Sequence, residues 1–250
     1  MKVNELCSII ENVAPLELAD DWDNVGLLVG DKNCTITGIV TCVDLTFGAI
    51  DYAIEHNCNM IITHHPVIFI PIKRVVYNDY SSDLIIKCIE NHINVYVSHT
   101  NMDMAENGIN FTFFKKLNVK AERFLNDGLG VFGEFNGDLD KLLLKVKEIT
   151  NEKALKFYKA QNTNLAEKCK IAFVSGSGGR IEEVAKKCAE KEIMVFISSE
   201  FKHNILLELI ANNVNVIEIG HFESEIIFTD IIYNLLKNKI SNLYKYVSLI

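Results

Sequence analysis

Histidines and carboxylates follow short apolar runs of this chain at the points where the runs end. His64 and His65 come directly after the run 60–63, and the next such run is followed by His99 and Asp103. Imidazole and carboxylate groups are common ligands of divalent metal ions in proteins. Their repetition at the ends of such runs therefore points to a metal site.

A second group of the same kind lies near the end of the chain. His221 follows the run 214–219, and Glu225 comes four residues after it. If a helix begins at His221, this spacing puts both side chains on one face, as in sites that hold a metal from a helix. A carboxylate such as Glu225 can also bridge two ions, as it does in many metal-dependent hydrolases.

The adjacent histidines bear on the number of ions. Neighbouring residues of an extended strand point in different directions, so His64 and His65 are expected to diverge and to suit two nearby metals better than one. Nitrogen and oxygen ligands without thiolate suit zinc, manganese, iron, cobalt or nickel, and they do not distinguish among these metals. The sequence therefore predicts two divalent ions of unspecified identity.

Each feature also has a purely structural explanation. The His64-His65 pair could end a strand, Asp103 could cap the helix that follows, and His221 with Glu225 could be a surface pair worth ~0.3–0.5 kcal/mol. Ligands of open α/β sheets bind at the carboxyl ends of the strands, and all these residues follow strand ends. This shared position favours a site over separate coincidences.

The elements that must position these residues alternate between strands and helices. Buried β-branched runs at 38–44, 60–64 and 94–98 are separated by helical segments at 46–57 and 81–91. Such alternation is typical of right-handed βαβ units. We predict an α/β fold of two domains with parallel or mixed sheets, and a metal site in the cleft at the C-terminal ends of the strands.

The domain boundary is expected where the pattern changes, at the Gly-rich segment 126–133. We expect a first α/β domain over 1–125, completed by the C-terminal segment 226–250, and a second α/β domain over 126–225. Strands in the second domain are expected near 155–160, 170–175, 193–198 and 214–219, with helices at 138–149, 180–190 and 203–212. The chain is expected to end in a strand at 244–250.

Composition limits the partners and the compartment. The formal net charge of −8 argues against a broad nucleic-acid surface. No apolar run approaches the ~20 residues of a bilayer-spanning helix, and we expect no signal peptide at the N-terminus. The seven cysteines show no CxxC spacing, which favours reduced thiols and a cytoplasmic location.

The segment Ser175–Arg180 is rich in glycine and precedes a predicted helix. Its backbone amides could form an anion-binding nest at the helix N-terminus. A tight strand-to-helix turn explains the same residues equally well. Neither a GxGxxG nor a P-loop pattern is present.

Several motifs together give the chain a recognisable character. They are Trp22-Asp23-Asn24-Val25-Gly26-Leu27, Val43-Asp44, Thr63-His64-His65-Pro66, Ser98-His99-Thr100-Asn101-Met102-Asp103 and Gly220-His221-Phe222-Glu223-Ser224-Glu225. With these motifs the chain resembles the NIF-three-like family, whose members carry the label GTP cyclohydrolase 1 type 2 homologue. The similarity extends over essentially the whole chain.

The resemblance implies a two-domain α/β fold with a dinuclear metal centre in the cleft. It implies five metal ligands, which are His64, His65, Asp103, His221 and Glu225. His99 and His203 would support these ligands or face the substrate, and the protein would form a homohexameric ring. Before the second-domain histidine the family usually has Gly-Asp or Gly-Glu, and this chain has Ser199-Glu200 instead. The family's usual His-His is His203-Asn204 in this chain.

We therefore expect a metal-dependent hydrolase of a small nucleotide-like or phosphate-bearing molecule. Metal-activated water would attack, and His99 or His203 would deliver a proton to the leaving group. The alternative is a non-catalytic metal-binding module with a regulatory or protein-interaction role. Turnover of a substrate distinguishes the two.

Overall fold

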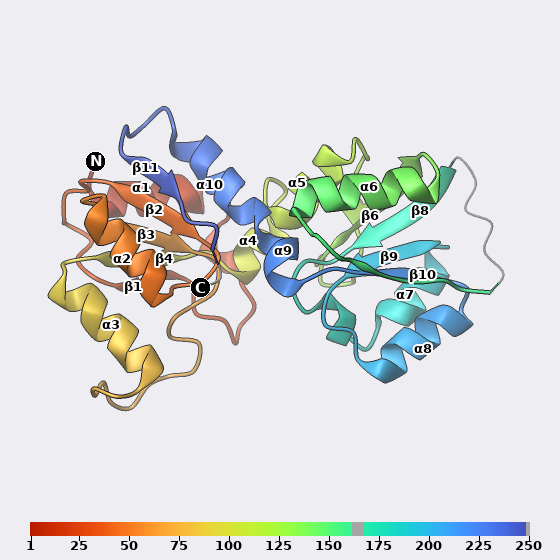
Figure 1. The fold of residues 1–250 in the computed structure, drawn as a ribbon, viewed down its shortest axis with the longest axis horizontal. Helices are drawn as coiled ribbons and strands as arrows, with labels where there is room; N and C mark the ends of the chain where they lie inside the picture. Colours follow the sequence, from red (N-terminus) through yellow and green to blue (C-terminus); the bar gives the residue numbers. More distant parts are fainter. Residues whose placement is uncertain (162–167, 249–250) are drawn as a thin grey trace. The chain divides into compact units, whose positions relative to one another are not determined.

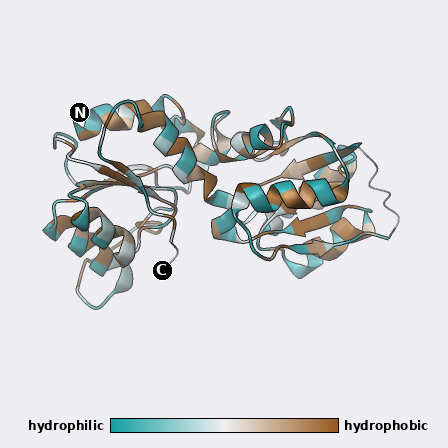
Figure 2. Cartoon of the chain, turned by 45° about the horizontal axis from the view of Figure 1, so that its top comes forward, coloured by the Kyte–Doolittle hydropathy of each residue, from teal (hydrophilic) through white to brown (hydrophobic). Residues whose placement is uncertain are grey.

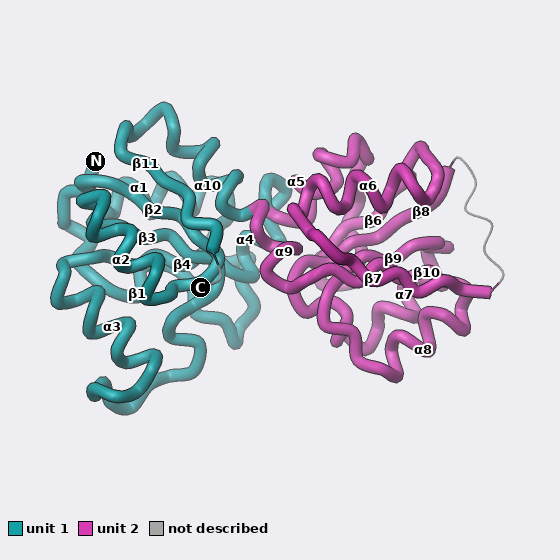
Figure 3. The backbone as a smooth tube through the Cα atoms, in the orientation of Figure 1, with its two compact units in different colours: residues 1–108, 228–250 teal, residues 109–227 magenta. Residues whose placement is uncertain are grey.

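A computed structural model of the 250-residue chain describes residues 1–161 and 168–248 (Figure 1). The chain divides into two compact units, of which the first comprises 1–108 with 228–250 and the second 109–227 (Figure 3). Each unit is built around its own sheet. No helix among the described residues is both long enough and apolar enough to cross a membrane.

Up to residue 248, the first unit contains five strands. Its elements in chain order are α1 (Val3–Glu11), η1 (Leu16–Leu18), β1 (Gly26–Val29), β2 (Ile39–Cys42), α2 (Phe47–Glu55), β3 (Met60–Thr63), α3 (Tyr80–Glu90), β4 (Asn94–Val97), α4 (Thr100–Met104), α10 (Ile227–Leu236, whose first residue belongs to the second unit) and β11 (Leu243–Lys245). The strand order is β1-β4-β3-β2-β11. All neighbours are parallel except β1, which runs antiparallel to β4.

Burial explains why β2, β3 and β4 form the centre of this sheet. All four residues of each strand are buried, as expected where helices cover both faces. The helices α2 and α3 pack on one face through residues such as Ile50 and Leu84. On the other face the buried Tyr96 reaches Glu11 of α1 through its hydroxyl. Figure 2 shows the resulting apolar strands between helices with polar outer faces.

The register of these three strands aligns their carboxyl ends. Cys42 of β2 pairs with Thr63 of β3, and Thr63 pairs with Val97 of β4. The residues that follow each strand therefore emerge at one edge of the sheet. This alignment is what brings the candidate ligands of the first unit together.

The described part of the second unit has six strands. Its elements are α5 (Ile109–Lys116), β5 (Glu122–Arg123), β6 (Val131–Asn136), α6 (Leu139–Thr150), β7 (Lys156–Tyr158), β8 (Lys168–Phe173), η2 (Gly178–Arg180), α7 (Val184–Glu190), β9 (Val195–Ser198), α8 (His203–Ala211), β10 (Asn215–Glu218) and α9 (His221–Glu225). The strand order is β5-β6-β8-β9-β10-β7, with β8, β9 and β10 parallel. The helices α7 and α8 cover one face and α5 and α6 the other (Figure 1). Phe196 and Val216 contribute to the core under α7 and α8.

The predicted fold class is confirmed, since both sheets are mixed and alternate with helices. The expected domain boundary near residue 125 stays a prediction, while the compact units divide after Gly108. The last residues of the Gly-rich segment belong to a strand, because β6 begins at Val131. The expected last strand, 244–250, extends beyond the described residues, and β11 ends at Lys245.

Two helical segments differ from the sequence expectations. No helix was expected directly before Asp103, but the short helix α4 begins there, directly after His99. The predicted helix 180–190 is divided, because η2 ends at Arg180 and α7 begins only at Val184. Both differences concern segments of one or two turns, for which periodicity in the sequence is too short to be diagnostic.

Candidate metal centre

Three histidines of the first unit gather at the sheet edge formed by the ends of β3 and β4. One ring nitrogen from each of His64, His65 and His99 lies within 4.8 Å of the other two. Asp103, one turn into α4, approaches the same group, and its Oδ2 is 3.7 Å from His64 Nε2. Three imidazoles and a carboxylate at these separations are a donor set that fits a divalent ion.

The expected divergence of the adjacent histidines is wrong. His64 and His65 follow β3 in a bend rather than continuing its extended backbone. Both of their backbone N–H groups donate to the carbonyl of Val43, at 3.0 Å each. The ring centroids are consequently only 5.0 Å apart. The alternation of side chains in a strand does not apply once the strand has ended.

Each candidate histidine is oriented by an acceptor at Nδ1. The pairs are His64 with the Ser98 carbonyl at 2.9 Å, His65 with Asp44 at 2.8 Å, His99 with Asp23 at 2.9 Å and His221 with Glu200 at 2.9 Å. A carbonyl or an ionised carboxylate can only accept, so Nδ1 must donate in each case. In the neutral ring, Nε2 then carries the lone pair. Metal-bound histidines in proteins usually have this arrangement.

Asp23 is the most firmly held of these acceptors. Its side chain is buried and accepts hydrogen bonds from His99 Nδ1, from the Thr100 backbone N–H at 3.0 Å and from the Thr100 hydroxyl at 2.5 Å. Burial alone raises the pKa of this carboxyl, but the hydrogen bonds from His99 and Thr100 outweigh that effect and hold the pKa well below its usual range. Asp23 therefore stays ionised and fixes the orientation of His99.

In the second unit, His221 and Glu225 lie on one face of α9, as their spacing predicts. His221 Nε2 is 3.2 Å from Glu225 Oε1. Because Nδ1 donates to Glu200, a neutral imidazole presents its lone pair to a carboxylate. Two acceptors at this distance require a cation, either a proton or a metal ion. Glu225 is buried, and a buried carboxylate needs a neighbouring cation most because water does not solvate its charge.

Gly176 provides the space for this pair. Its backbone has φ +59°, and a Cβ at this position would lie 2.4 Å from Glu225 Oε1 and 3.4 Å from His221 Nε2. The Gly176 N–H donates to the hydroxyl of Ser224 at 2.9 Å, and its carbonyl accepts from Ser199. Only glycine combines this backbone conformation with such a close approach.

The segment Ser175–Arg180 is a tight turn, and the structure does not support an anion nest. Several of its amides already donate within the protein: Ser175 to Asn110, Gly176 to Ser224, Gly179 to Ser199 and Arg180 to Ser177. The side chain of Arg180 pairs with Glu200, with Nε 2.9 Å from Oε2. Its role is thus to hold the partner of His221.

Three acidic residues hold candidate histidines but were not predicted as site residues: Asp23, Asp44 and Glu200. Asp44 follows β2 and Glu200 follows β9, so each lies at a strand end as the candidate ligands do. Glu200 also has the left-handed φ of +56°, a conformation uncommon for glutamate. The strand-end position was the available signal, whereas the pairing with a particular histidine is a tertiary contact.

His203 begins α8 and is exposed. Within the described residues it forms no hydrogen bond or ion pair with His221 or Glu225. Its expected catalytic role stays a prediction. His99, by contrast, lies among the histidines of its unit, with centroids 5.1 Å from His64 and 5.4 Å from His65.

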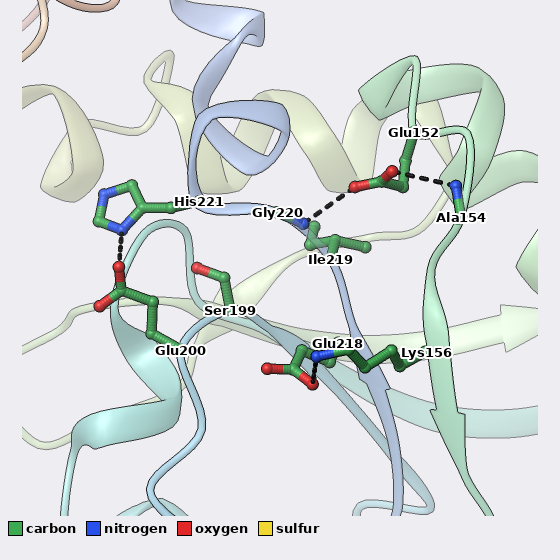
Figure 4. Close-up of a pocket in the computed structure, with 9 residues that line it drawn as sticks. All are labelled: Glu152, Ala154, Lys156, Ser199, Glu200, Glu218, Ile219, Gly220 and His221. Atoms are coloured by element: carbon green, nitrogen blue, oxygen red, sulfur yellow. Dashed lines mark hydrogen bonds and ion pairs between the residues drawn. The ribbon is translucent and has the colours of Figure 1, made fainter.

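A polar pocket of about 350 Å³ borders His221 in the second unit. It is lined by Glu152, Ala154, Lys156, Ser199, Glu200, Glu218, Ile219, Gly220 and His221 (Figure 4). Its carboxylates are engaged by protein donors: Glu152 by the Gly220 and Ala154 amides, and Glu218 by Lys156 and Tyr158. The pocket therefore offers space beside His221, and both of these carboxylates have hydrogen-bond donors from the protein.

The buried thiols are poor candidates for the chemistry of this protein. All seven cysteines are free, and five of them are buried. Burial raises the pKa of Cys169 to about 11 and that of Cys88 to about 12. Such thiols remain protonated at neutral pH and are weak nucleophiles and metal ligands.

Residues 1–249 match the family described as DUF34/NIF3 (NGG1p interacting factor 3). The chain belongs to this family. A relative from Clostridium acetobutylicum, named GTP cyclohydrolase 1 type 2 homolog, is 36% identical over 235 residues, which are 90% of this chain and 85% of that protein. A relative of the same name from Staphylococcus epidermidis is 46% identical over 126 residues, 50% of this chain but only 34% of that longer protein.

A solved structure supports the same assignment. Reduced HcgD from Methanocaldococcus jannaschii matches with a TM-score of 0.87 at 26% identity, and the match covers 98% of this chain and 97% of that one. The resemblance noted from the motifs is thereby confirmed for the fold and the family. The family match and the named relatives do not establish the metal content or the reaction of this chain.

Proposed function

We propose that this protein is a metal-dependent hydrolase of a small nucleotide-like or phosphate-bearing molecule. The ligands would be His64, His65 and Asp103 from the first unit with His221 and Glu225 from the second, holding two divalent ions. The observation that carries this proposal is the shared orientation of the histidines, whose Nδ1 atoms donate to fixed acceptors. This leaves each Nε2 available for a metal ion.

The metal ions would supply Lewis-acid activation of water and of the scissile group. The protein would supply orientation, through Asp44 at His65 and Glu200 at His221. His99, held by Asp23, is our candidate for delivering a proton to the leaving group, with His203 as the second candidate. The 350 Å³ pocket beside His221 is within the range of ~300–1,000 Å³ that small ligands occupy.

Turnover of nucleotides and phosphate esters by metal-loaded protein tests this proposal. We expect wild type to hydrolyse at least one compound, and Glu225→Ala to lose that activity. Glu208→Ala, which removes an exposed glutamate of α8, serves as the matched control and should retain it. Activity unchanged in Glu225→Ala would reject the mechanism. Stable metal binding without turnover of any compound would favour the non-catalytic metal-binding module.

The homohexameric ring and the cytoplasmic location also remain proposals. Support for self-association comes from an apolar loop of the first unit, in which Ile70, Val76 and Tyr77 are exposed. A cluster of exposed apolar residues often marks a protein–protein interface. Light scattering coupled to size-exclusion chromatography should give a mass of six chains, and a monomer would contradict it.

A further inference from the structure

Two exposed aromatic side chains flank His99 in the first unit. The Trp22 ring lies 5.5 Å from the Phe69 ring, and these rings lie 6.1 Å and 6.3 Å from the His99 ring between centroids. Trp22 is 57% exposed and Phe69 is 50% exposed. The two large apolar rings thus stand beside His99, our candidate proton donor, without being part of the core.

Hydrogen bonds from neighbouring residues fix the segments that carry both rings. Asp23, next to Trp22, accepts from His99 and from the backbone and hydroxyl of Thr100. Asn24 Nδ2 donates to the Ile68 carbonyl at 2.6 Å, and Ile68 precedes Phe69. The aromatic pair is therefore positioned relative to His99 from both sides, which is preorganisation rather than incidental exposure.

The geometry of the pair leaves ring faces available. The planes of Trp22 and Phe69 are inclined at 57°, so the rings do not cover each other as a stacked pair would. Both rings are inclined by 70° or more to the plane of His99 and meet it edgewise. An uncovered indole face is the feature that proteins use to stack planar bases.

From this arrangement we propose that Trp22 and Phe69 form a stacking site for a planar heteroaromatic ring, of the nucleobase class, in the ligand of this protein. The inference rests on the proposed function, because it places the ring at the aromatic pair while the reacting group lies at the histidines. A contact with another protein is the competing use of exposed aromatic residues. The position of the pair against His99 favours a ligand that also reaches the metal centre.

Trp22 is the only tryptophan of the chain, so its fluorescence reports on this site directly. The experiment titrates metal-free and metal-loaded protein with GMP, AMP and ribose 5-phosphate, excited at the red edge of indole absorption, where purines do not absorb. We expect saturable quenching by GMP or AMP and none by ribose 5-phosphate. Phe69→Ala should weaken the binding of the nucleotide about tenfold.

Phe47→Ala is the matched control, because Phe47 is an exposed aromatic residue of the same unit that contacts Tyr80 and not His99. It should leave the affinity unchanged. Trp22→Ala lacks the reporter and is measured by calorimetry, with the same loss expected as for Phe69→Ala. Circular dichroism confirms that each variant is folded.

Three results would overturn the stacking site. They are equal quenching by ribose 5-phosphate, unchanged affinity in Phe69→Ala, and an emission that changes with protein concentration but not with nucleotide, which would assign the rings to a contact between chains. Metal content measured on the same samples separates this inference from the proposed function. Metal-loaded protein that does not bind the nucleotides rejects the stacking site alone, whereas protein that takes up no metal on loading but still binds purines rejects the metal centre alone.

Discussion

The candidate histidines depend on residues that would not themselves touch a metal ion. Asp44 and Glu200 each accept a hydrogen bond from the Nδ1 of one histidine and so determine which nitrogen carries the lone pair. Asp23 does the same for His99 and is itself held by Thr100. A ligand whose ring is fixed before binding loses less conformational entropy when the metal arrives.

Removal of the Asp44 carboxylate tests this dependence. Asp44→Ala leaves every proposed ligand in place but frees the His65 ring to rotate and to change tautomer. We expect the metal affinity to fall about 10–100-fold. Competition with a chromogenic chelator measures it. Asp51→Ala, which removes an exposed carboxylate of α2, should bind like wild type, and equal affinities of the two variants would contradict the orienting role.

Asp23 should also contribute to stability in a pH-dependent way. Its folded-state pKa is depressed, so the unfolded chain binds the proton more tightly. The stability that Asp23 contributes is therefore present above the unfolded pKa of about 3.9, and is lost as the pH falls through the lower folded value. Asp23→Asn should lose roughly 2 kcal/mol at neutral pH, typical of a buried charged hydrogen-bonding group.

Urea unfolding at a series of pH values measures this difference. The free energies of wild type and Asp23→Asn should converge as the medium becomes more acidic. Asp51→Asn, at an exposed site, is the control and should follow the wild-type profile. A constant difference between Asp23→Asn and wild type at all pH values would show that Asp23 stabilises the fold by packing and not by its charge.

At the scale of elements, parallel strands in register bring residues distant in sequence to one edge. Because β2, β3 and β4 end at paired residues, Asp44, His65 and His99 follow at the same edge. This much of the site could be predicted, since continuous β-branched runs identify buried strands. The convergence of His64 with His65 could not, because it depends on the bend after β3.

Other features could not be predicted from the sequence for similar physical reasons. Helix α4 has only five residues, too few for a hydrophobic period to appear. Strand β6 alternates correctly, but it begins beside glycines that resemble a linker. The orienting residues Asp23 and Glu200 lie far in sequence from their histidines, and no local pattern encodes such a pairing.

The turn that follows β8 gives a prediction at this scale. In Gly176→Ala, the added methyl group would meet the Glu225 carboxylate, and the left-handed backbone would be strained as well. We expect both a lower free energy of unfolding and a weaker metal affinity. Gly26→Ala is the matched control, because Gly26 also has a positive φ but its nearest neighbours lie 3.9 Å away.

Comparing the two alanine variants separates the effect of backbone strain from the effect of the close contact with Glu225. Backbone strain alone costs roughly 1–3 kcal/mol at either position, and Gly26→Ala should show that loss with normal metal affinity. Chemical denaturation and metal titration measure the two quantities. If Gly176→Ala also binds metal like wild type, the space beside Glu225 is not needed for binding.

At the scale of the whole molecule, the five residues that we propose as metal ligands are divided between the two α/β units. His64, His65 and Asp103 lie in the first unit, and His221 and Glu225 lie in the second. We therefore expect a change in either unit to affect the binding of metal by the whole chain.

Metal content per chain, measured on protein purified without chelator, tests this expectation most directly. Wild type should contain about two equivalents of divalent metal, and Glu208→Ala should contain the same. Asp103→Ala in the first unit and Glu225→Ala in the second should each lose metal. Wild type that stays metal-free after incubation with zinc, manganese, iron, cobalt or nickel would contradict the account, as would variants that retain both equivalents.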